Sequence, residues 1–347
     1  MTGAGDLFLP SKHSQAHRIP VVVVGTGSIG ARHLKVLNGA VNTQAWAMPL
    51  RPGRMTDLAQ DGYTTVPDLV TAAAQGARHA IVATDTRRHV ADAESALVLN
   101  MAVLVEKPVA PDAQAAYVLS RRATRAGLPL FVGCVLRFSE AINEFRVQLP
   151  RIGRIHAVRI ECQSYLPDWR PGRPYRETYS ARVGEGGVLR DLIHEIDYAA
   201  WIFGWPAAVE GYVRNLGRLG IEADESAELL WTTDAGAMVS ISLDYLSRPS
   251  RRRMRASGEH GTLEWDGVAG RVTLALAGEP ELVFQSGQTM DEMLRAQDLA
   301  FAEIGHGGLA DARLATGLDG AHALAICEAA YRSSDTRREE KVGYIET

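Results

Sequence analysis

Four consecutive valines followed by a glycine-rich turn constrain the fold of this chain more than any other feature. Residues 21–24 are all valine, and the next six residues are Gly25-Thr26-Gly27-Ser28-Ile29-Gly30. A β-branched run without polar alternation is typical of a parallel strand buried on both faces. The amphipathic pattern of residues 29–37 predicts a helix directly after the turn, which is the context of a phosphate-binding loop.

The three glycines of this turn have different expected roles. Gly25 permits the tight turn, Gly27 lets backbone N–H groups approach a pyrophosphate, and Gly30 allows the helix to pack closely on the strand. The N-terminus of the following helix would add partial positive charge. The alternative is a glycine-rich turn without a ligand. The predicted dinucleotide contacts in this segment are Gly25, Thr26, Gly27, Ser28, Ile29 and Gly30.

Short apolar runs alternate with helical stretches up to about residue 138. Candidate strands occupy residues 21–24, 44–48, 79–83, 102–105 and 130–135, and candidate helices residues 29–37, 56–60, 66–74, 89–99 and 112–126. This alternation predicts an α/β fold with a doubly wound parallel sheet, the Rossmann architecture. We assign residues 19–138 to this dinucleotide-binding domain and expect residues 1–18 to be a disordered tail, because they contain no apolar stretch typical of a signal peptide.

The pattern changes after residue 139. A helix is expected at residues 140–148, a long strand at 155–165, a loop at 166–183 and a helix at 188–203. Strands follow at residues 209–216, 226–232, 237–245, 252–257, 261–265 and 271–276, and helices at 289–304 and 317–332. A succession of strands separated by turn signals predicts a C-terminal α+β domain, residues 139–316, with a large, open, mostly antiparallel sheet.

Charge and cysteine content exclude several classes of protein. The net charge is −4, and the basic triplet Arg251-Arg252-Arg253 is more typical of a solvated strand edge than of a nucleic-acid-binding patch. The three cysteines lack metal-ligand spacing, so we expect reduced thiols and no metal site. No apolar run approaches the ~20 residues of a membrane span. We therefore expect a cytoplasmic protein that binds neither nucleic acid nor membranes.

A lysine follows the strand predicted at residues 102–105, within Glu106-Lys107-Pro108. Ligands bind at the carboxyl ends of strands in open α/β sheets, so Lys107 is expected beside a nicotinamide, where burial could shift its pKa. Glu106 is expected to contact the cofactor. The alternative is a surface lysine that pairs with Glu106.

Residues after two other strands are further candidates for cofactor binding. No acid precedes Asp57 after the second strand, where an acid would bind ribose hydroxyls. Arg51 and Arg54 could hold a 2′-phosphate instead, which favours NADP over NAD unless both arginines are merely solvated. Thr84, Asp85 and His89 follow the third main strand and could face the cofactor, or they could simply begin a helix.

Asp191 and His194 are three residues apart on the helix predicted at 188–203. Leu192 and Ile196 belong to its apolar stripe, so Asp191 and His194 are expected to share a neighbouring polar face. An ordinary amphipathic helix is the alternative, but Lys107 makes an interdomain Lys–Asp–His site the more economical hypothesis. The preceding loop combines aromatic rings, which stack on sugars, with arginines, although a dimer-forming arm would have a similar composition. Its predicted substrate contacts are Tyr165, Trp169, Arg170, Tyr175 and Tyr179.

Together these segments resemble the glucose–fructose oxidoreductase/inositol dehydrogenase (Gfo/Idh/MocA-type) family. The similar pieces are residues 21–30 and 83–89, Glu106-Lys107-Pro108, Arg137-Phe138, Gly186-Gly187, and Asp191 with His194-Glu195-Ile196-Asp197. The resemblance implies an NAD(P)-dependent oxidoreductase acting on a secondary alcohol of a sugar, sugar nucleotide or cyclitol. It also implies a helix at residues 317–332 that packs back onto the cofactor domain, Arg137 as a further substrate contact, and a homodimer or homotetramer formed through the open sheet.

In this resemblance Lys107, Asp191 and His194 match the active-site lysine, aspartate and histidine. Two features depart from the family pattern: the aspartate precedes the histidine by three residues instead of four, and the ribose-binding acid is missing. We expect His194 to act as general acid/base and protonated Lys107 to polarise the carbonyl oxygen, with the reverse division also possible. The rival functions are redox-neutral catalysis of the glycoside-cleaving type and a non-catalytic NAD(P)-binding sensor.

Overall fold

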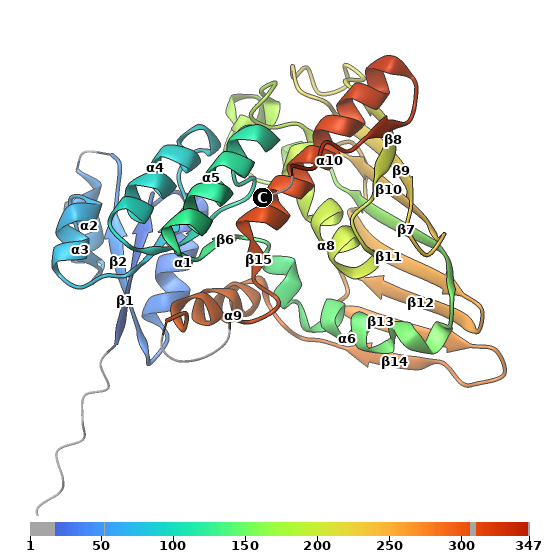
Figure 1. Ribbon diagram of the computed structural model, residues 1–347, viewed down its shortest axis with the longest axis horizontal. Coiled ribbons are helices and arrows are strands. Elements are labelled where there is room, and N and C mark those ends of the chain that lie inside the picture. The colour runs from blue at the N-terminus through green and yellow to red at the C-terminus, as the bar shows by residue number, and fades with distance from the viewer. Residues whose placement is uncertain (1–17, 52, 306–309, 346–347) are drawn as a thin grey trace, which may run out of the picture.

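A seven-stranded sheet with helices on both faces forms the first half of the molecule (Figure 1). The computed structural model describes residues 18–51, 53–305 and 310–345. The strands of this sheet are β1 (Ile19–Val24), β2 (Thr43–Met48), β3 (Thr64–Thr65), β4 (His79–Val82), β5 (Ala102–Val105), β6 (Leu130–Val132) and β15 (Ala315–Thr316). The helices of this part are α1 (Ser28–Asn38), α2 (Arg54–Gln60), α3 (Leu69–Ala74), α4 (Thr86–Val98) and α5 (Ala113–Ala126).

The valine run occupies β1, and its side chains pack alternately against the helices on the two faces of the sheet. Val22 and Val24 belong to one buried cluster with residues of α4 and α5, whereas Val21 and Val23 belong to another with residues of α1. The strand order is β15-β6-β5-β4-β1-β2-β3, and every described pair is parallel except β15 with β6. The order reverses between β1 and β4, which is the point where doubly wound sheets bind ligands.

A nine-stranded sheet dominates the second half. Its strands are β7 (Ile155–Gln163), β8 (Ala208–Arg214), β9 (Ser226–Thr232), β10 (Met238–Asp244), β11 (Arg251–Gly258), β12 (Gly261–Asp266), β13 (Arg271–Leu276), β14 (Leu282–Gln285) and β16 (Glu340–Lys341). The order is β14-β13-β12-β11-β7-β10-β9-β8-β16, with only β7 and β10 parallel among the described pairs. The helices of this half and the linking segments are α6 (Glu140–Gln148), α7 (Val188–Asp191), α8 (Ile193–Phe203), α9 (Met290–Ala302) and α10 (Gly317–Thr336), and short 3-10 turns are η1 (Val135–Phe138), η2 (Leu149–Ile152), η3 (Leu166–Asp168), η4 (Tyr175–Glu177) and η5 (Tyr179–Ala181).

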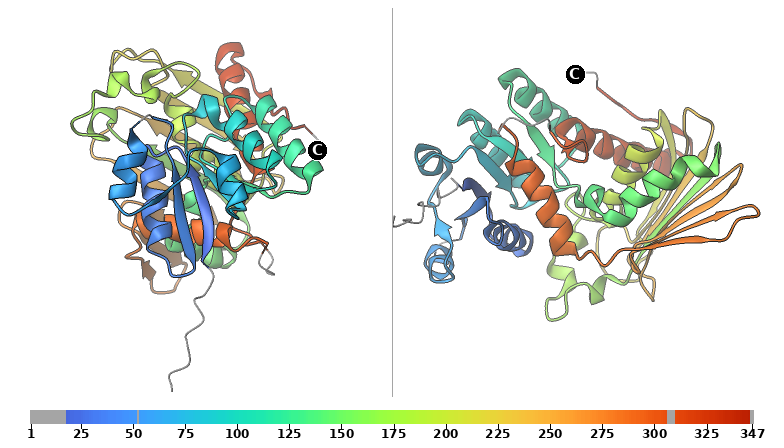
Figure 2. Two further views of the ribbon diagram at one scale, coloured as in Figure 1. Left: turned by 90° about the vertical axis from the view of Figure 1, so that its left-hand side faces the viewer. Right: turned by 90° about the horizontal axis from the view of Figure 1, so that it is seen from below.

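One face of the second sheet is buried and the other is open. Residues of β9 and β10 alternate strictly between buried and more exposed positions, as expected when only one face packs on a core. The helices lie on the side that faces the first domain, and the opposite side is bare in the view from below (Figure 2). On that bare side Tyr212, Leu230 and Met238 remain exposed.

Helix α10 contacts both halves of the molecule. It packs against α5 of the first sheet's helical layer and against β8 and α8 of the second domain. The contact with β8 is close, because a Cβ at Gly211 would lie 2.5 Å from the carbonyl oxygen of Ala330. No helix in the described residues is long and apolar enough to cross a membrane.

The predicted fold class is confirmed, with a few differences in individual elements. The helix expected at residues 188–203 is broken at Leu192, whose φ of −96° and ψ of 28° separate α7 from α8. The strand expected at residues 130–135 ends at Val132 and is followed by the 3-10 turn η1. β3, β15 and β16 were not predicted because two-residue strands carry no periodicity, and β14 was missed because most of its side chains are exposed. Nearly all of the predicted tail lies outside the described residues.

Candidate active site

The glycine turn leaves an open approach to the N-terminus of α1. Gly25 has a φ of 89°, and a Cβ there would lie 2.8 Å from the carbonyl oxygen of Ala83. A Cβ at Gly30 would collide with the Gly25 carbonyl oxygen, whereas a Cβ at Gly27 would meet nothing within 4 Å. Gly27 is the N-cap of α1 and offers no side chain to its first-turn N–H groups. These N–H groups therefore fit a phosphate ligand, as the dinucleotide hypothesis requires.

Lys107 reaches across the domain boundary to α7. Its Nζ donates a 2.7 Å hydrogen bond to the backbone carbonyl of Asp191. In a continuous helix that carbonyl would accept from the N–H of Glu195, but here the Glu195 N–H bonds to the carbonyl of Leu192 instead. The break at Leu192 thus frees a backbone acceptor for the lysine. Burial by itself lowers the pKa of Lys107, but Tyr179, Asp191 and Glu106 outweigh it and raise the pKa above its usual value.

His194 lies at the start of α8 and is neutral. Burial lowers the pKa of its imidazole well below the usual value, and the positive charges of Lys107 and Arg252 lower it further. Its Nδ1 is buried and has no hydrogen-bond partner among the described residues. A neutral imidazole beside a protonated lysine can accept a proton, whereas the lysine can only donate.

Asp191 is held by a residue that the sequence analysis missed. The hydroxyl of Tyr245, which is fully buried just beyond β10, donates a 2.6 Å hydrogen bond to Oδ2 of Asp191. The ring of Trp169 packs edge-on against Tyr245, with centroids 5.3 Å apart. Tyr245 fits the apolar alternation of its strand, so no signal separated it from an ordinary core aromatic residue.

The substrate contacts predicted in the loop after β7 divide into two groups. Tyr179 is close enough to Lys107 and Asp191 to interact electrostatically with both, and Arg170 lies over its ring, 5.7 Å from the centroid. Tyr175 instead donates to the carbonyl of Leu219. Two other predicted substrate contacts also have partners within the chain. Trp169 donates to Ser164, and Tyr165 lies under the guanidinium of Arg248.

Arg137, a predicted substrate contact, is buried and paired with carboxylates of its own chain. Only 2% of the residue is exposed, and its guanidinium donates two hydrogen bonds to Asp197, at 3.0 and 2.6 Å. A third contact of 3.3 Å reaches Asp319 at the start of α10. Arg137 therefore joins η1 to α8 and α10 in this structure, and a substrate contact from it stays a prediction. Sequence pattern does not distinguish an arginine that binds an external anion from one that binds a carboxylate of its own chain.

The predicted cofactor contacts after β4 have partners within the chain. Both ring nitrogens of His89 contact backbone carbonyls, of Pro108 at 2.8 Å and of Thr84 at 3.0 Å, and the side chain is buried. His89 therefore ties the loop after β4 to the Glu-Lys-Pro turn, and a cofactor contact from its ring stays a prediction. Thr84 donates to Asp92, and Asp85 is the N-cap of α4 without a side-chain capping bond.

The arginines after β2 are at the surface. Arg51 is exposed, and Arg54 makes a 3.3 Å ion pair with Asp57 whose two side chains are 42% and 56% exposed. An exposed pair of this kind contributes little stability and leaves the guanidinium available to a ligand. Among the described residues there is no group of three or more His, Cys, Asp or Glu side chains arranged to hold a metal ion.

The comparisons with known proteins agree with this geometry. Residues 19–134 match the profile described as "Oxidoreductase family, NAD-binding Rossmann fold", and residues 146–264 match the "GFO/IDH/MocA C-terminal domain". Myo-inositol dehydrogenase Hyg17 of Streptomyces leeuwenhoekii is 28% identical over 328 residues, which is 90% of this chain and 97% of that protein.

Two solved structures show the same fold over nearly the whole chain. An inositol dehydrogenase homolog complexed with NAD+ from Azotobacter vinelandii has a TM-score of 0.82 and 19% identity, covering 94% of this chain and 98% of its own. A levoglucosan dehydrogenase in complex with NADH and levoglucosan has a TM-score of 0.84 and 16% identity, covering 94% and 100%.

The fold and the matched profiles define an NAD-binding oxidoreductase with a Rossmann domain and a second domain built on an open sheet. The chain belongs to the Gfo/Idh/MocA family. The resemblance drawn from Glu106-Lys107-Pro108 and the segment around His194 is thereby confirmed.

Proposed function

We propose that this protein is an NAD(P)-dependent dehydrogenase that oxidises a secondary alcohol of a sugar, sugar nucleotide or cyclitol, or reduces the matching ketone. The observation that carries the proposal is the contact of Lys107, which follows β5, with the Asp191 carbonyl. The raised pKa of Lys107 and the lowered pKa of His194, to which the charge of Lys107 contributes, support it. When bound, the nicotinamide supplies or accepts the hydride. Relatives that act on inositol and levoglucosan support the substrate class.

The chain's own residues divide the remaining work. His194 accepts the hydroxyl proton in oxidation, because its imidazole is neutral. Lys107 donates a hydrogen bond to the same substrate oxygen and stabilises its negative charge as the carbonyl forms or is reduced. Asp191, fixed by Tyr245, orients the lysine through its backbone carbonyl and keeps a negative charge close to the ammonium group.

The experiment is a turnover assay with NAD and with NADP on a panel of cyclitols, hexoses, anhydrosugars and sugar nucleotides. Reduced cofactor formed with at least one polyol supports the proposal. Cofactor binding without turnover of any compound in the panel would contradict the dehydrogenase proposal and favour an NAD(P)-binding sensor. Product formation without net reduction of the cofactor would instead indicate the redox-neutral chemistry.

We further propose that Arg51 and Arg54 bind the 2′-phosphate of NADP. Both lie directly after β2, where doubly wound folds contact the adenosine ribose, and no carboxylate precedes Asp57 there. Guanidinium groups form bidentate bonds with phosphate oxygens.

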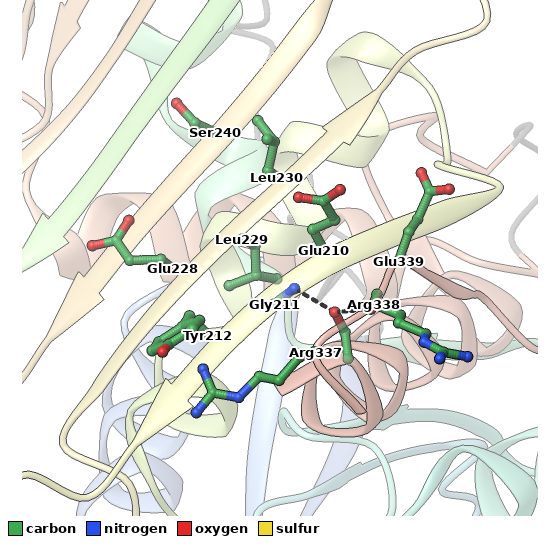
Figure 3. Close-up of a pocket in the computed structure, with 11 residues that line it drawn as sticks. Glu210, Gly211, Tyr212, Glu228, Leu229, Leu230, Ser240, Arg337, Arg338 and Glu339 are labelled. Atoms are coloured by element: carbon green, nitrogen blue, oxygen red, sulfur yellow. Dashed lines mark hydrogen bonds between the residues drawn. The ribbon is translucent and has the colours of Figure 1, made fainter. Parts of the chain in front are cut away.

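We also propose that two copies of the chain pair through the bare face of the second sheet. Beside the exposed Tyr212 and Leu230, a hollow of about 600 Å³ opens between β8–β10 and residues 337–339 after α10 (Figure 3). Leu230→Glu would place a charge at the edge of this hollow. A dimer in light scattering that becomes a monomer in this variant supports the pairing, and a monomeric parent protein would overturn it.

A further inference from the structure

A buried histidine lies directly behind the Glu-Lys-Pro turn. His33 is on α1, one turn after Gly30, and is completely buried. Its Nδ1 is 2.7 Å from Oδ2 of Asp298 on α9, and its Nε2 is 3.1 Å from Oε1 of Glu106 at the end of β5. Three elements that are far apart in sequence therefore meet at one imidazole ring.

The contacts of the ring define its protonation state. Ionised carboxylates can only accept, so beside ionised Asp298 and Glu106 both ring nitrogens carry a hydrogen and His33 is an imidazolium. Burial by itself lowers the pKa of His33, but the charges and hydrogen bonds of Asp298 and Glu106 raise it to about 10. His33 is thus a cation at neutral pH, buried between two acidic side chains.

The same cluster continues to Lys107. The second oxygen of Glu106, Oε2, accepts from the backbone N–H of Lys107 at 3.3 Å, and the Lys107 Nζ reaches the Asp191 carbonyl. Residue 133 must lack a side chain here, because a Cβ on Gly133 would lie 2.5 Å from Oε1 of Glu106. A chain of contacts therefore links α1, which carries the phosphate-binding turn, to α7 through the lysine.

Stability does not account for these buried charges. Apolar residues of similar size commonly stabilise a protein as well as a buried ion cluster does. The α1–α9 contact already has apolar members, Leu34 and Phe301 among them, and surface ion pairs of Arg32 and Lys35 with Asp291. The contact between α1 and α9 therefore does not require the charge of His33.

We propose that His33 is a positioning residue that acts through Glu106: it holds the Glu106 carboxylate, and with it the backbone of Lys107, in the geometry that directs the lysine to the reacting oxygen. The effect on turnover rests on the proposed dehydrogenase function, whereas the effect on Lys107 does not. Neither His33 nor Asp298 touches substrate in this assignment.

A double-mutant cycle tests whether His33 acts through Glu106. His33→Gln presents an NH₂ donor on one side and an acceptor oxygen on the other, so it cannot donate to both carboxylates. We expect it to lower kcat ~10- to 100-fold with a much smaller change in cofactor affinity. The double variant His33→Gln/Glu106→Gln is expected to be no slower than Glu106→Gln alone. Losses that multiply would overturn the proposal. His79→Gln is the matched control, since His79 is a buried histidine of β4 whose Nε2 contacts the carbonyl of Ile304.

A second readout needs no turnover. Lys107 is labelled with an amine-reactive reagent and quantified by mass spectrometry against exposed Lys35 of the same chain. His33→Gln should label several-fold faster at Lys107 and unchanged at Lys35, and labelling as in wild type would overturn the proposal. If His33→Gln does not fold, Asp298→Asn replaces it in both tests, with the same expected directions. An enzyme without activity on any polyol would end the proposed function and leave the labelling result decisive.

Discussion

Lys107 and Asp191 are joined by a hydrogen bond between the lysine ammonium and a main-chain carbonyl, not between two side chains. The bond exists because the helix around Asp191 is interrupted at Leu192. It leaves the Asp191 carboxylate free to accept from Tyr245. Asp191 thus binds two partners, Lys107 through its main-chain carbonyl and Tyr245 through its carboxylate. Its unusual spacing of three residues from His194 spans the helix break at Leu192.

Lys107→Met is expected to lower kcat by at least ~100-fold while cofactor affinity changes little, because the ammonium acts on charge that develops during the reaction. Steady-state kinetics together with cofactor titration would separate the two quantities. Lys35→Met on the exposed face of α1 is the matched control and should behave as wild type. Near-normal turnover in Lys107→Met would remove the lysine from the mechanism.

The pH dependence of oxidation should follow His194. Because the pKa of its imidazole is well below the usual 6.5, the proton-accepting form persists at pH 6.5, and kcat/KM should stay level down to that pH. It should fall only at lower pH, as the ring takes up a proton. The profile of kcat/KM against pH measures this directly. His194→Gln should be slower by ~100-fold or more and should lose the acid limb. A limb near pH 6.5 that survives in the variant would assign the titration to another group.

Tyr245→Phe removes one hydroxyl and tests whether Asp191 needs its fixed orientation. Hydrogen bonds to charged groups contribute about 1.5–3 kcal/mol, so we expect kcat/KM to fall ~10-fold or more. The comparison is with Tyr344→Phe, which loses a hydroxyl bonded to the Pro206 carbonyl far along the chain from the site. Equal kinetics in the two variants would make Tyr245 a core residue only.

The fold was predictable because its signals are local and periodic. The valines of β1 and the alternation in β9 each identify the environment of a strand from its own sequence. Lys107 could be identified because it sits at a strand end, a position with a known geometric meaning. His33 and Tyr245 could not, because their roles depend on partners 73 and 54 residues away in sequence. The contact that the break at Leu192 permits depends equally on a distant residue, since it is Lys107 that binds the carbonyl left free by the break.

Arg51→Ala/Arg54→Ala tests the cofactor proposal. Removing both guanidinium groups should raise the dissociation constant of NADP ~10-fold or more and leave that of NAD nearly unchanged, because only NADP carries the 2′-phosphate. Fluorescence titration of both reduced cofactors gives the two constants. Arg78→Ala, on the loop before β4, is the control for a general loss of positive charge. An equal change for both cofactors would rule out a 2′-phosphate site at these arginines.

Arg137→Gln should be a stability variant. It leaves Asp197, 2% exposed, without its cation, and breaking a buried pair in this way costs ~3–5 kcal/mol. Urea unfolding would show the loss, and the folded fraction should keep its substrate KM. Arg253→Gln removes an ion pair with Asp266 in which the arginine is 56% exposed, so it should cost at most about 1 kcal/mol. A stable Arg137→Gln with a raised KM would support the predicted substrate contact and show that the pairing of Arg137 with Asp197 opens in the working enzyme.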